Sequence, residues 1–214
     1  MCTGRVDASF LLRAFSNGMD GVFIGGCWLG ECHYLTQGNY HAVSMMLLTR
    51  KLLRQIGIEP ERLRIEWISA SQGTRFAEVM TDFAAQIKEL GPIGIKPNED
   101  GNGLKAKLEA ARSVVPYLRL VERERLRVHF ETKEEYERFF ATDEVERIYK
   151  ESVGDRLEIN LMLSLLREKP LSTPELAQAL GLGVTEVSRL LGIAARERLT
   201  TFDEAEKRFA AAEA

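Results

Sequence analysis

The sequence GVFIGGCWLGECH, residues 21–33, decides the fold because it joins a short apolar run to two cysteines. Residues 21–25 are bounded by glycines, which is typical of a strand buried on both faces of a parallel sheet. Cys27 follows at the carboxyl end of this strand, and Cys32 lies in the next loop. Open α/β sheets bind their ligands in the crevice outside those carboxyl ends. The stretch therefore predicts an α/β fold with a ligand site at the cysteines.

The segments on either side of this strand continue the alternation of helices and strands. Upstream, residues 8–17 predict a short helix that begins after Asp7 and ends at Gly18. Downstream, the spacing of apolar residues predicts three further elements, which are a helix over 40–56, a strand over 63–68 and a helix over 76–90. This order predicts a small doubly wound parallel sheet of the flavodoxin or Rossmann type.

A stretch dense in Gly, Pro, Asn and Asp separates this part of the chain from a helical remainder. It predicts an α/β domain over residues 1–94 and a linker over 95–103. Residues 104–152 predict a helical connector of two or three helices, which Pro116 interrupts. Residues 153–214 predict an all-helical region with a winged-helix-like helix-turn-helix, which we expect to be a docking domain.

Composition excludes several classes of protein. The 214 residues carry a formal net charge of −3, which argues against a protein that coats nucleic acid with clustered Lys and Arg. We expect a cytoplasmic protein that does not enter a membrane, because the sequence shows neither a membrane-spanning apolar run nor a signal peptide. The 3 cysteines all fall within the first 32 residues, and an odd number favours metal ligation or redox chemistry over a disulfide framework.

Cys2, Cys27 and Cys32 are the candidate ligands. Cys2 falls where a preceding strand would end, so we expect all three thiols at one edge of the sheet. Thiolates suit iron–sulfur clusters and zinc, and the nearby glycines at 25, 26 and 30 let backbone N–H groups approach cluster sulfurs. Each cysteine alone is equally well explained as a small buried hydrophobic residue. Their grouping favours ligation.

Histidines offer one more candidate ligand. His33 could be a fourth ligand, because imidazole replaces thiolate in Rieske-type centres. The preferred interpretation of His33 is a loop residue outside the ligand set. His41 is interpreted as an ordinary helix residue and His129 as an ordinary surface residue.

Three strings carry a resemblance to a known family: CTGRVD at 2–7, DGVFIGGCWLGECHYLTQGNYHA at 20–42 and ERLRIEWISASQGTRFAEVM at 61–80. Over roughly residues 1–94 the chain resembles the delta subunit of methyl-viologen-reducing hydrogenase. The resemblance implies a 2Fe-2S cluster held by the family's ligand residues, which are here Cys2, Cys27 and Cys32. Other positions that match the family motif are Gly4-Arg5, Gly38-Asn39 and Arg75.

The resemblance also implies a role in anaerobic electron transfer. Electrons would pass from a hydrogenase, or from a formate- or NADH-oxidising module, to the flavin-containing subunit of a heterodisulfide reductase. Members of the family usually begin with a further segment that contains a strand and additional cysteines. We therefore expect this chain to lack the first strand of the sheet and to supply three thiols to a cluster that usually needs four ligands.

Two other functions remain open for the same residues. An iron–sulfur-responsive winged-helix transcription regulator would place its second helix in a major groove. Few basic residues support that interpretation, because acidic residues accompany the arginines of the candidate helix: Arg189, Arg196 and Arg198 stand beside Glu186 and Glu197. A zinc-stabilised structural adaptor would use the same thiols. We expect no bond-making chemistry by the chain itself, since no nucleotide-binding fingerprint or activated nucleophile is evident.

Overall fold

The computed structural model describes residues 2–34, 37–94 and 101–212. The chain divides into two compact units, Met1–Ser152 and Val153–Ala214. Of the predicted linker over 95–103, residues 95–100 lie outside the described residues, and the helix that follows already begins at Gly101.

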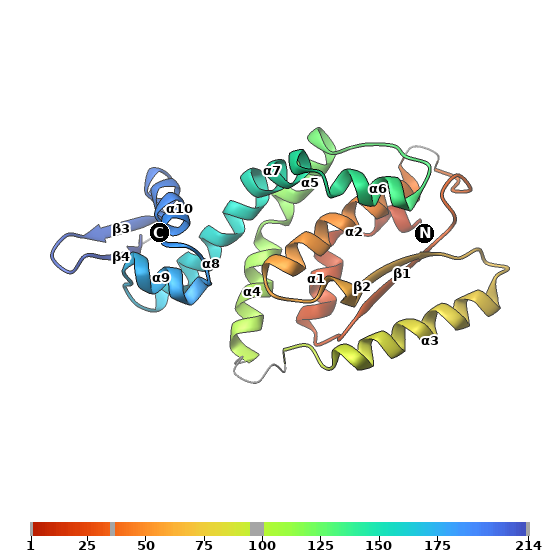
Figure 1. The fold of residues 1–214 in the computed structure, drawn as a ribbon, viewed down its shortest axis with the longest axis horizontal. Coiled ribbons are helices and arrows are strands. Elements are labelled where there is room, and N and C mark those ends of the chain that lie inside the picture. Colours follow the sequence, from red (N-terminus) through yellow and green to blue (C-terminus); the bar gives the residue numbers. More distant parts are fainter. Residues whose placement is uncertain (1, 35–36, 95–100, 213–214) are drawn as a thin grey trace. The chain divides into compact units, whose positions relative to one another are not determined.

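Helices and a small parallel sheet make up the first unit (Figure 1). Its elements are η1 (Thr3–Arg5), α1 (Ala8–Ser16), β1 (Val22–Gly26), α2 (Gly38–Gln55), η2 (Pro60–Arg62), β2 (Leu63–Trp67), α3 (Gly73–Leu90), α4 (Gly101–Ser113), α5 (Val115–Arg125), α6 (Lys133–Phe140) and α7 (Asp143–Tyr149). A short π-helix, η3 (Lys150–Gly154), follows α7. The predicted α/β class is confirmed.

The sheet pairs β1 with β2 in parallel, in a register that sets Ile24 against Ile65 and Gly26 against Trp67. Figure 1 shows α1 and α2 on one side of these strands and α3 on the other. Side chains on the α2 side are buried, with Ile65 fully so. This arrangement brings the carboxyl ends of both strands to one edge, as expected for parallel strands.

The prediction that β1 is buried on both faces is wrong for the face toward α3. Ile24 and Gly26 are buried, whereas Phe23 is half-buried and Gly25 is exposed. The reason is that α3 covers this face only in part, through a contact in which the rings of Phe23 and Phe83 lie 5.8 Å apart. Phe83 is the one buried residue among those described in α3. Most of the apolar stripe of this amphipathic helix is therefore not held against the sheet.

The helix boundaries follow the local signals in the sequence. The Asp7 side chain accepts a hydrogen bond from the Ser9 amide and begins α1, and Gly18 ends that segment with a φ of 83°. Pro116 lies in the first turn of α5, where a missing N–H is tolerated, so the chain breaks between α4 and α5. The connector region contains α4 to α7, more helices than the two or three predicted.

The second unit consists of α8 (Asp155–Glu168), α9 (Thr173–Leu180), α10 (Val184–Arg196), β3 (Thr200–Asp203) and β4 (Arg208–Ala211). Ser172 and Glu175 form the capping box that starts α9, and Gly181 takes the left-handed conformation that ends it. The expectation of an all-helical region is wrong at the C-terminal end, because β3 and β4 pair as an antiparallel hairpin. The rings of Phe202 and Phe209 contact each other across this hairpin in a tilted arrangement, with their centroids 4.6 Å apart. Such a cross-strand pair favours strands over helix.

A hydrophobic core holds the second unit together. Leu176, Val187 and Leu190 are fully buried in it, and Phe209 of the hairpin packs against it. Among the described residues of the whole chain, no helix is both long enough and apolar enough to span a membrane.

Candidate metal centre

The three cysteines meet at the edge where β1 ends. Cys2 precedes η1, Cys27 directly follows β1, and Cys32 lies in the loop before α2. The sulfurs of Cys2 and Cys32 are 4.0 Å apart, and the Cys27 thiol lies near enough to Cys32 for each to shift the pKa of the other. Cys32 is only 3% exposed, and the other two cysteines are half-buried. The predicted convergence of the three side chains is therefore observed.

Two glycines allow this approach. A β-carbon on Gly38, the first residue of α2, would lie 2.2 Å from the Cys32 sulfur. A β-carbon on Gly4 would lie 2.3 Å from the carbonyl oxygen of Gly38. A side chain on Gly4 would push η1, and with it Cys2, away from α2, and a side chain on Gly38 would displace the Cys32 sulfur. These positions fall in the motif strings of the sequence, but their role depends on a contact that sequence spacing does not reveal.

Backbone N–H groups lie near the sulfurs. The Gly4 amide donates to the Cys2 sulfur over 3.4 Å, and the backbone amides of Asn39 and Tyr34 lie near enough to the Cys32 thiol to lower its pKa. Burial alone would raise the pKa of the Cys32 thiol, but these two amides and the neighbouring thiols outweigh it, so its pKa lies below the usual value. Burial and the adjacent Cys32 raise the pKa of Cys27. The centre thus favours negative charge on the sulfur at the N-terminus of α2.

The glycines predicted to admit amides to a cluster have other roles. A β-carbon on Gly26 would lie 2.9 Å from the Thr3 hydroxyl and 3.0 Å from the Trp67 ring, so Gly26 allows η1 to pack on the strand end. The Thr3 hydroxyl also donates to the carbonyl of Gly25 over 3.1 Å. Gly30 has a φ of 84° and turns the loop between the cysteines.

Trp28 is fixed beside the centre. Its indole N–H donates to the Gln72 side chain over 3.0 Å, and the Arg75 guanidinium lies over its ring at 5.1 Å. Gln72 and Arg75 belong to the turn and helix that follow β2, so the second strand end contributes to the same edge. His33 is exposed, and its ring contacts Tyr34 edge-on. Its part in ligation stays a prediction.

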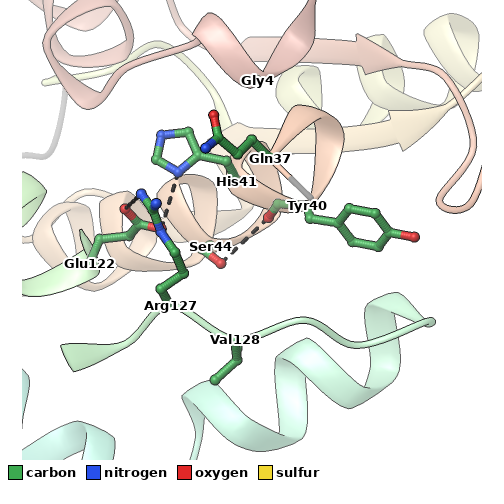
Figure 2. A pocket seen from close by; sticks show the side chains of 8 residues that line it. All are labelled: Gly4, Gln37, Tyr40, His41, Ser44, Glu122, Arg127 and Val128. Atoms are coloured by element: carbon green, nitrogen blue, oxygen red, sulfur yellow. Dashed lines mark hydrogen bonds and ion pairs between the residues drawn. The ribbon is translucent and has the colours of Figure 1, made fainter. Parts of the chain in front are cut away.

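A polar cavity of about 170 Å³ lies next to the centre, between Gly4 of η1, the start of α2 and the chain after α5 (Figure 2). Glu122 lines this cavity, and its side chain is only 4% exposed. Its carboxylate pairs with His41 Nδ1 at 3.1 Å and with Arg127 at 3.5 Å. His41 therefore does more than the ordinary helix residue that the sequence suggests. The pairing joins α2 to α5 across 81 positions, which no local pattern signals.

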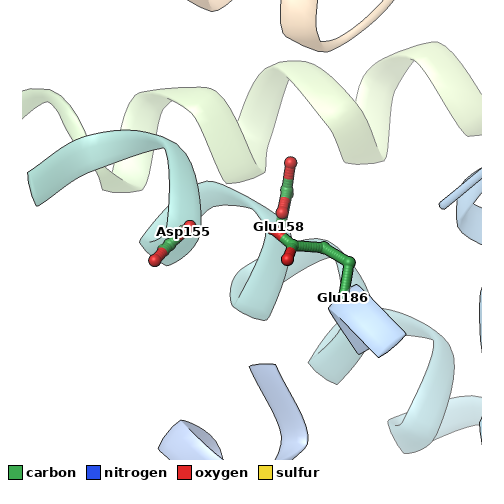
Figure 3. A group of neighbouring side chains, drawn as sticks. All are labelled: Asp155, Glu158 and Glu186. Atoms are coloured by element: carbon green, nitrogen blue, oxygen red, sulfur yellow. The ribbon is translucent and has the colours of Figure 1, made fainter. Parts of the chain in front are cut away.

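Acidic side chains gather in the second unit, where Asp155, Glu158 and Glu186 lie close together (Figure 3). The Arg189 guanidinium donates to both oxygens of Asp155, at 2.7 and 2.6 Å, and also pairs with Glu186. This arginine neutralises much of the cluster, so the acidic grouping by itself does not define a metal site.

The residues at the sheet edge fit part of an iron–sulfur ligand set. Such clusters are usually held by four cysteine thiolates and receive hydrogen bonds from backbone amides. The chain offers 3 cysteines at one site, with a backbone amide that donates to the Cys2 sulfur and two that lie near the Cys32 thiol. Fold and site together define a class of protein, a small α/β protein with three thiols gathered at one edge of its sheet, and thiolates are the ligands that soft metals and iron–sulfur clusters prefer.

Comparison with known proteins gives the family. The family described as "Methyl-viologen-reducing hydrogenase, delta subunit" matches residues 1–91. The iron-sulfur subunit of an F420-non-reducing hydrogenase from Archaeoglobus profundus is 57% identical over 92 residues, which are 43% of this chain and 66% of that relative. The vhc iron-sulfur subunit of the F420-non-reducing hydrogenase from Methanococcus voltae is 48% identical over 98 residues, which are 46% of this chain and 67% of the relative. The chain belongs to the methyl-viologen-reducing hydrogenase delta-subunit family.

A larger relative contains the same segment. One subunit of the ferredoxin:CoB-CoM heterodisulfide reductase from Methanosarcina mazei is 43% identical over 94 residues, which are 44% of this chain and 12% of that protein. The chain thus spans about two thirds of the small relatives that it matches and a small part of the large one. Relatives named as hydrogenase and heterodisulfide reductase subunits support an electron-transfer role.

Proposed function

We propose that this chain is the iron–sulfur electron-transfer subunit of a larger oxidoreductase complex, without bond-making chemistry of its own. It receives electrons from a hydrogenase, or from a formate- or NADH-oxidising module, and passes them to a flavoprotein subunit of the heterodisulfide-reductase type. A 2Fe-2S cluster is the proposed cofactor, with Cys2, Cys27 and Cys32 as its ligands from this chain. The observation that carries the proposal is the convergence of these thiols, with the Cys2 and Cys32 sulfurs 4.0 Å apart.

The residues of the chain have distinct roles in this mechanism. A bound cluster supplies reversible one-electron chemistry. The thiolates of Cys2, Cys27 and Cys32 would hold the iron, and the backbone amides of Gly4, Asn39 and Tyr34 would stabilise negative charge on the sulfurs. Burial of Cys32 limits access of water to that side of the site. The structure around the cysteines is fixed by hydrogen bonds, which keeps reorganisation during electron transfer small.

The relatives support the choice of partners. A segment of about 94 residues occurs in proteins named as hydrogenase iron-sulfur subunits and within a protein named as a heterodisulfide reductase subunit. A module that occurs in both settings is well placed to connect a hydrogen-oxidising donor with a heterodisulfide-reducing acceptor. We also propose that the protein works in the cytoplasm and in anaerobic metabolism.

Exposed aromatic side chains near the cysteines offer a surface for such a partner. Tyr34 is 57% exposed, and its β-carbon lies close to Gly38 beside Cys32. Phe76 is 51% exposed and follows Arg75, which contacts Trp28. Aromatic residues are enriched at the core of protein interfaces. A partner that docks on this surface would approach the metal centre closely.

Two finer aspects of the fold belong to the same proposal. We propose that the two-stranded sheet is part of a doubly wound, flavodoxin-like sheet, and that the second unit is a winged-helix-like docking domain. Docking is favoured over DNA binding because Asp155 and Glu186 already engage Arg189, the first arginine of α10. A guanidinium held by two carboxylates is a poor donor to phosphates or base edges.

Anaerobic purification followed by iron, sulfide and zinc analysis tests the function. We expect iron and sulfide in equal amounts, with loss of most of the iron in Cys2→Ser, Cys27→Ser and Cys32→Ser variants. His33→Ala serves as the control, since His33 is exposed beside the site, and it should retain its iron. Stoichiometric zinc without iron would instead support the structural adaptor and reject electron transfer.

A further inference from the structure

Asn39 occupies a position between the two cysteines of the 27–32 loop. It lies in the first turn of α2 and is completely buried. Its side-chain Nδ2 donates to the carbonyl oxygens of Cys27 at 2.6 Å and Trp28 at 2.8 Å. One amide group thus holds two consecutive carbonyls of the loop that leaves β1.

The same residue also reaches the sulfurs. Its Nδ2 lies 3.9 Å from the Cys27 sulfur, and its backbone amide lies near enough to the Cys32 thiol to lower its pKa. Cys32 is held over the start of α2 by the adjacent Gly38, whose missing β-carbon leaves room for the sulfur. Asn39 is therefore the residue through which α2 contacts both cysteines of the loop.

The stability of the fold does not explain why position 39 carries an asparagine side chain. Among the described residues, the Asn39 Oδ1 atom has no hydrogen-bond partner although it is buried. An unsatisfied buried acceptor destabilises the folded state, and an apolar side chain of the same shape would avoid this cost. Such a side chain would, however, remove both N–H donors from the carbonyls of Cys27 and Trp28. The geometry therefore points to the donors as the reason for an amide at this position.

We propose that Asn39 is a positioning residue for the metal centre. Its side chain holds the Cys27–Trp28 backbone against α2, so that the sulfurs of Cys27 and Cys32 face one shared ligand. Its N–H groups stabilise negative charge there and set the reduction potential of a bound cluster. The second part rests on the proposed iron–sulfur function, whereas the first part concerns the protein alone.

Thiol alkylation of the metal-free full-length chain tests the first part. Cys32 is 3% exposed, so it reacts only when the loop opens. Asn39→Leu keeps the branched shape of the side chain, with larger terminal groups, and removes two hydrogen bonds, and we expect Cys32 to react about tenfold faster. The substitution leaves the backbone amide beside the Cys32 thiol unchanged, so the change in rate reports opening of the loop. Asn39→Ser, a smaller change, provides the same comparison should Asn39→Leu not fold.

The matched control is Thr49→Val. Thr49 is also fully buried on α2, and its hydroxyl donates to the Met45 carbonyl over 2.7 Å within the helix. This variant removes a buried hydrogen bond on the same helix without touching the cysteine loop. We expect alkylation of Cys32 in Thr49→Val at the wild-type rate.

The reduction potential of the anaerobically prepared holoprotein tests the second part. We expect Asn39→Leu to have a more negative midpoint potential and to lose iron faster to a chelator than Thr49→Val does. Equal alkylation rates in both variants would overturn the positioning role, and equal potentials would overturn the effect on the cluster. If the wild-type chain holds no iron while Asn39→Leu still alkylates faster, the positioning role stands and the proposed function fails.

Discussion

The cysteine site and the second unit differ in the range of the contacts that build them. The centre brings Cys2 to Cys32 across 30 positions and depends on close approach of η1, the loop after β1 and α2. The second unit is set by signals within a few residues, such as the Ser172–Glu175 capping box and the left-handed Gly181. Local chemistry thus determines where the helices begin and end, whereas the cysteine site depends on where glycines let separate elements come into contact.

The largest expected effect comes from the core of the second unit. Leu190→Ala removes a fully buried side chain of this core, and we expect a loss of about 3 kcal/mol in the free energy of unfolding of that unit. Denaturant titration of the full chain would measure it. If the two units are built independently, the alkylation rate of Cys32 stays unchanged, and an increase would contradict that independence.

A glycine substitution tests whether close contact between elements builds the cysteine site. Gly38→Ala places a β-carbon 2.2 Å from the Cys32 sulfur, so we expect a loss of about 2 kcal/mol and a clear drop in bound iron. Gly73→Ala is the matched control, because Gly73 is also the first residue of its helix and its added β-carbon meets nothing within 4 Å. The interpretation of the centre is wrong if both variants behave alike.

The smallest expected effect concerns the ion pair between Asp7 and Arg119. Burial opposes ionisation of Asp7, but hydrogen bonds from Arg119 and Ser9 prevail and lower its pKa from 3.8 to about 2. This shift corresponds to roughly 2.5 kcal/mol, which we reduce to about 1 kcal/mol because solvent screens the half-exposed Arg119. Asp7→Asn keeps a good N-cap, so it isolates the charge.

The pH dependence of that variant has a definite sign. A lowered pKa in the folded state means that the stabilisation is complete above the unfolded pKa and disappears as the pH falls through the folded pKa. Wild type should therefore exceed Asp7→Asn in stability at neutral pH, and the gap should close between about pH 4 and pH 2. Thermal unfolding across this range measures it, with Asp82→Asn at an exposed ion pair as the control. A gap that persists at pH 2 would mean that charge is not its source.

The sequence predicts most of the secondary structure. The cap at Asp7, the glycine-bounded strand and the Ser172 capping box each place an element boundary close to the observed one. The winged-helix-like pattern allows a wing after α10 but does not give the bounds of β3 and β4, because an alanine-rich end gives little strand signal before Phe202 and Phe209 pair.

The site is predicted in part. The residue types and the position of Cys27 at a strand end suffice to predict that the three cysteines lie close together. The contributions of Gly4, Gly38 and the buried Glu122 depend on packing between elements far apart in the chain, which neither periodicity nor spacing contains.

X-ray absorption at the iron and zinc edges of the anaerobically purified chain is the most direct test of the central claim. We expect iron with a shell of sulfur neighbours and a second iron close by, and no stoichiometric zinc. A sample that contains zinc alone, or iron bound only to oxygen and nitrogen, would contradict it.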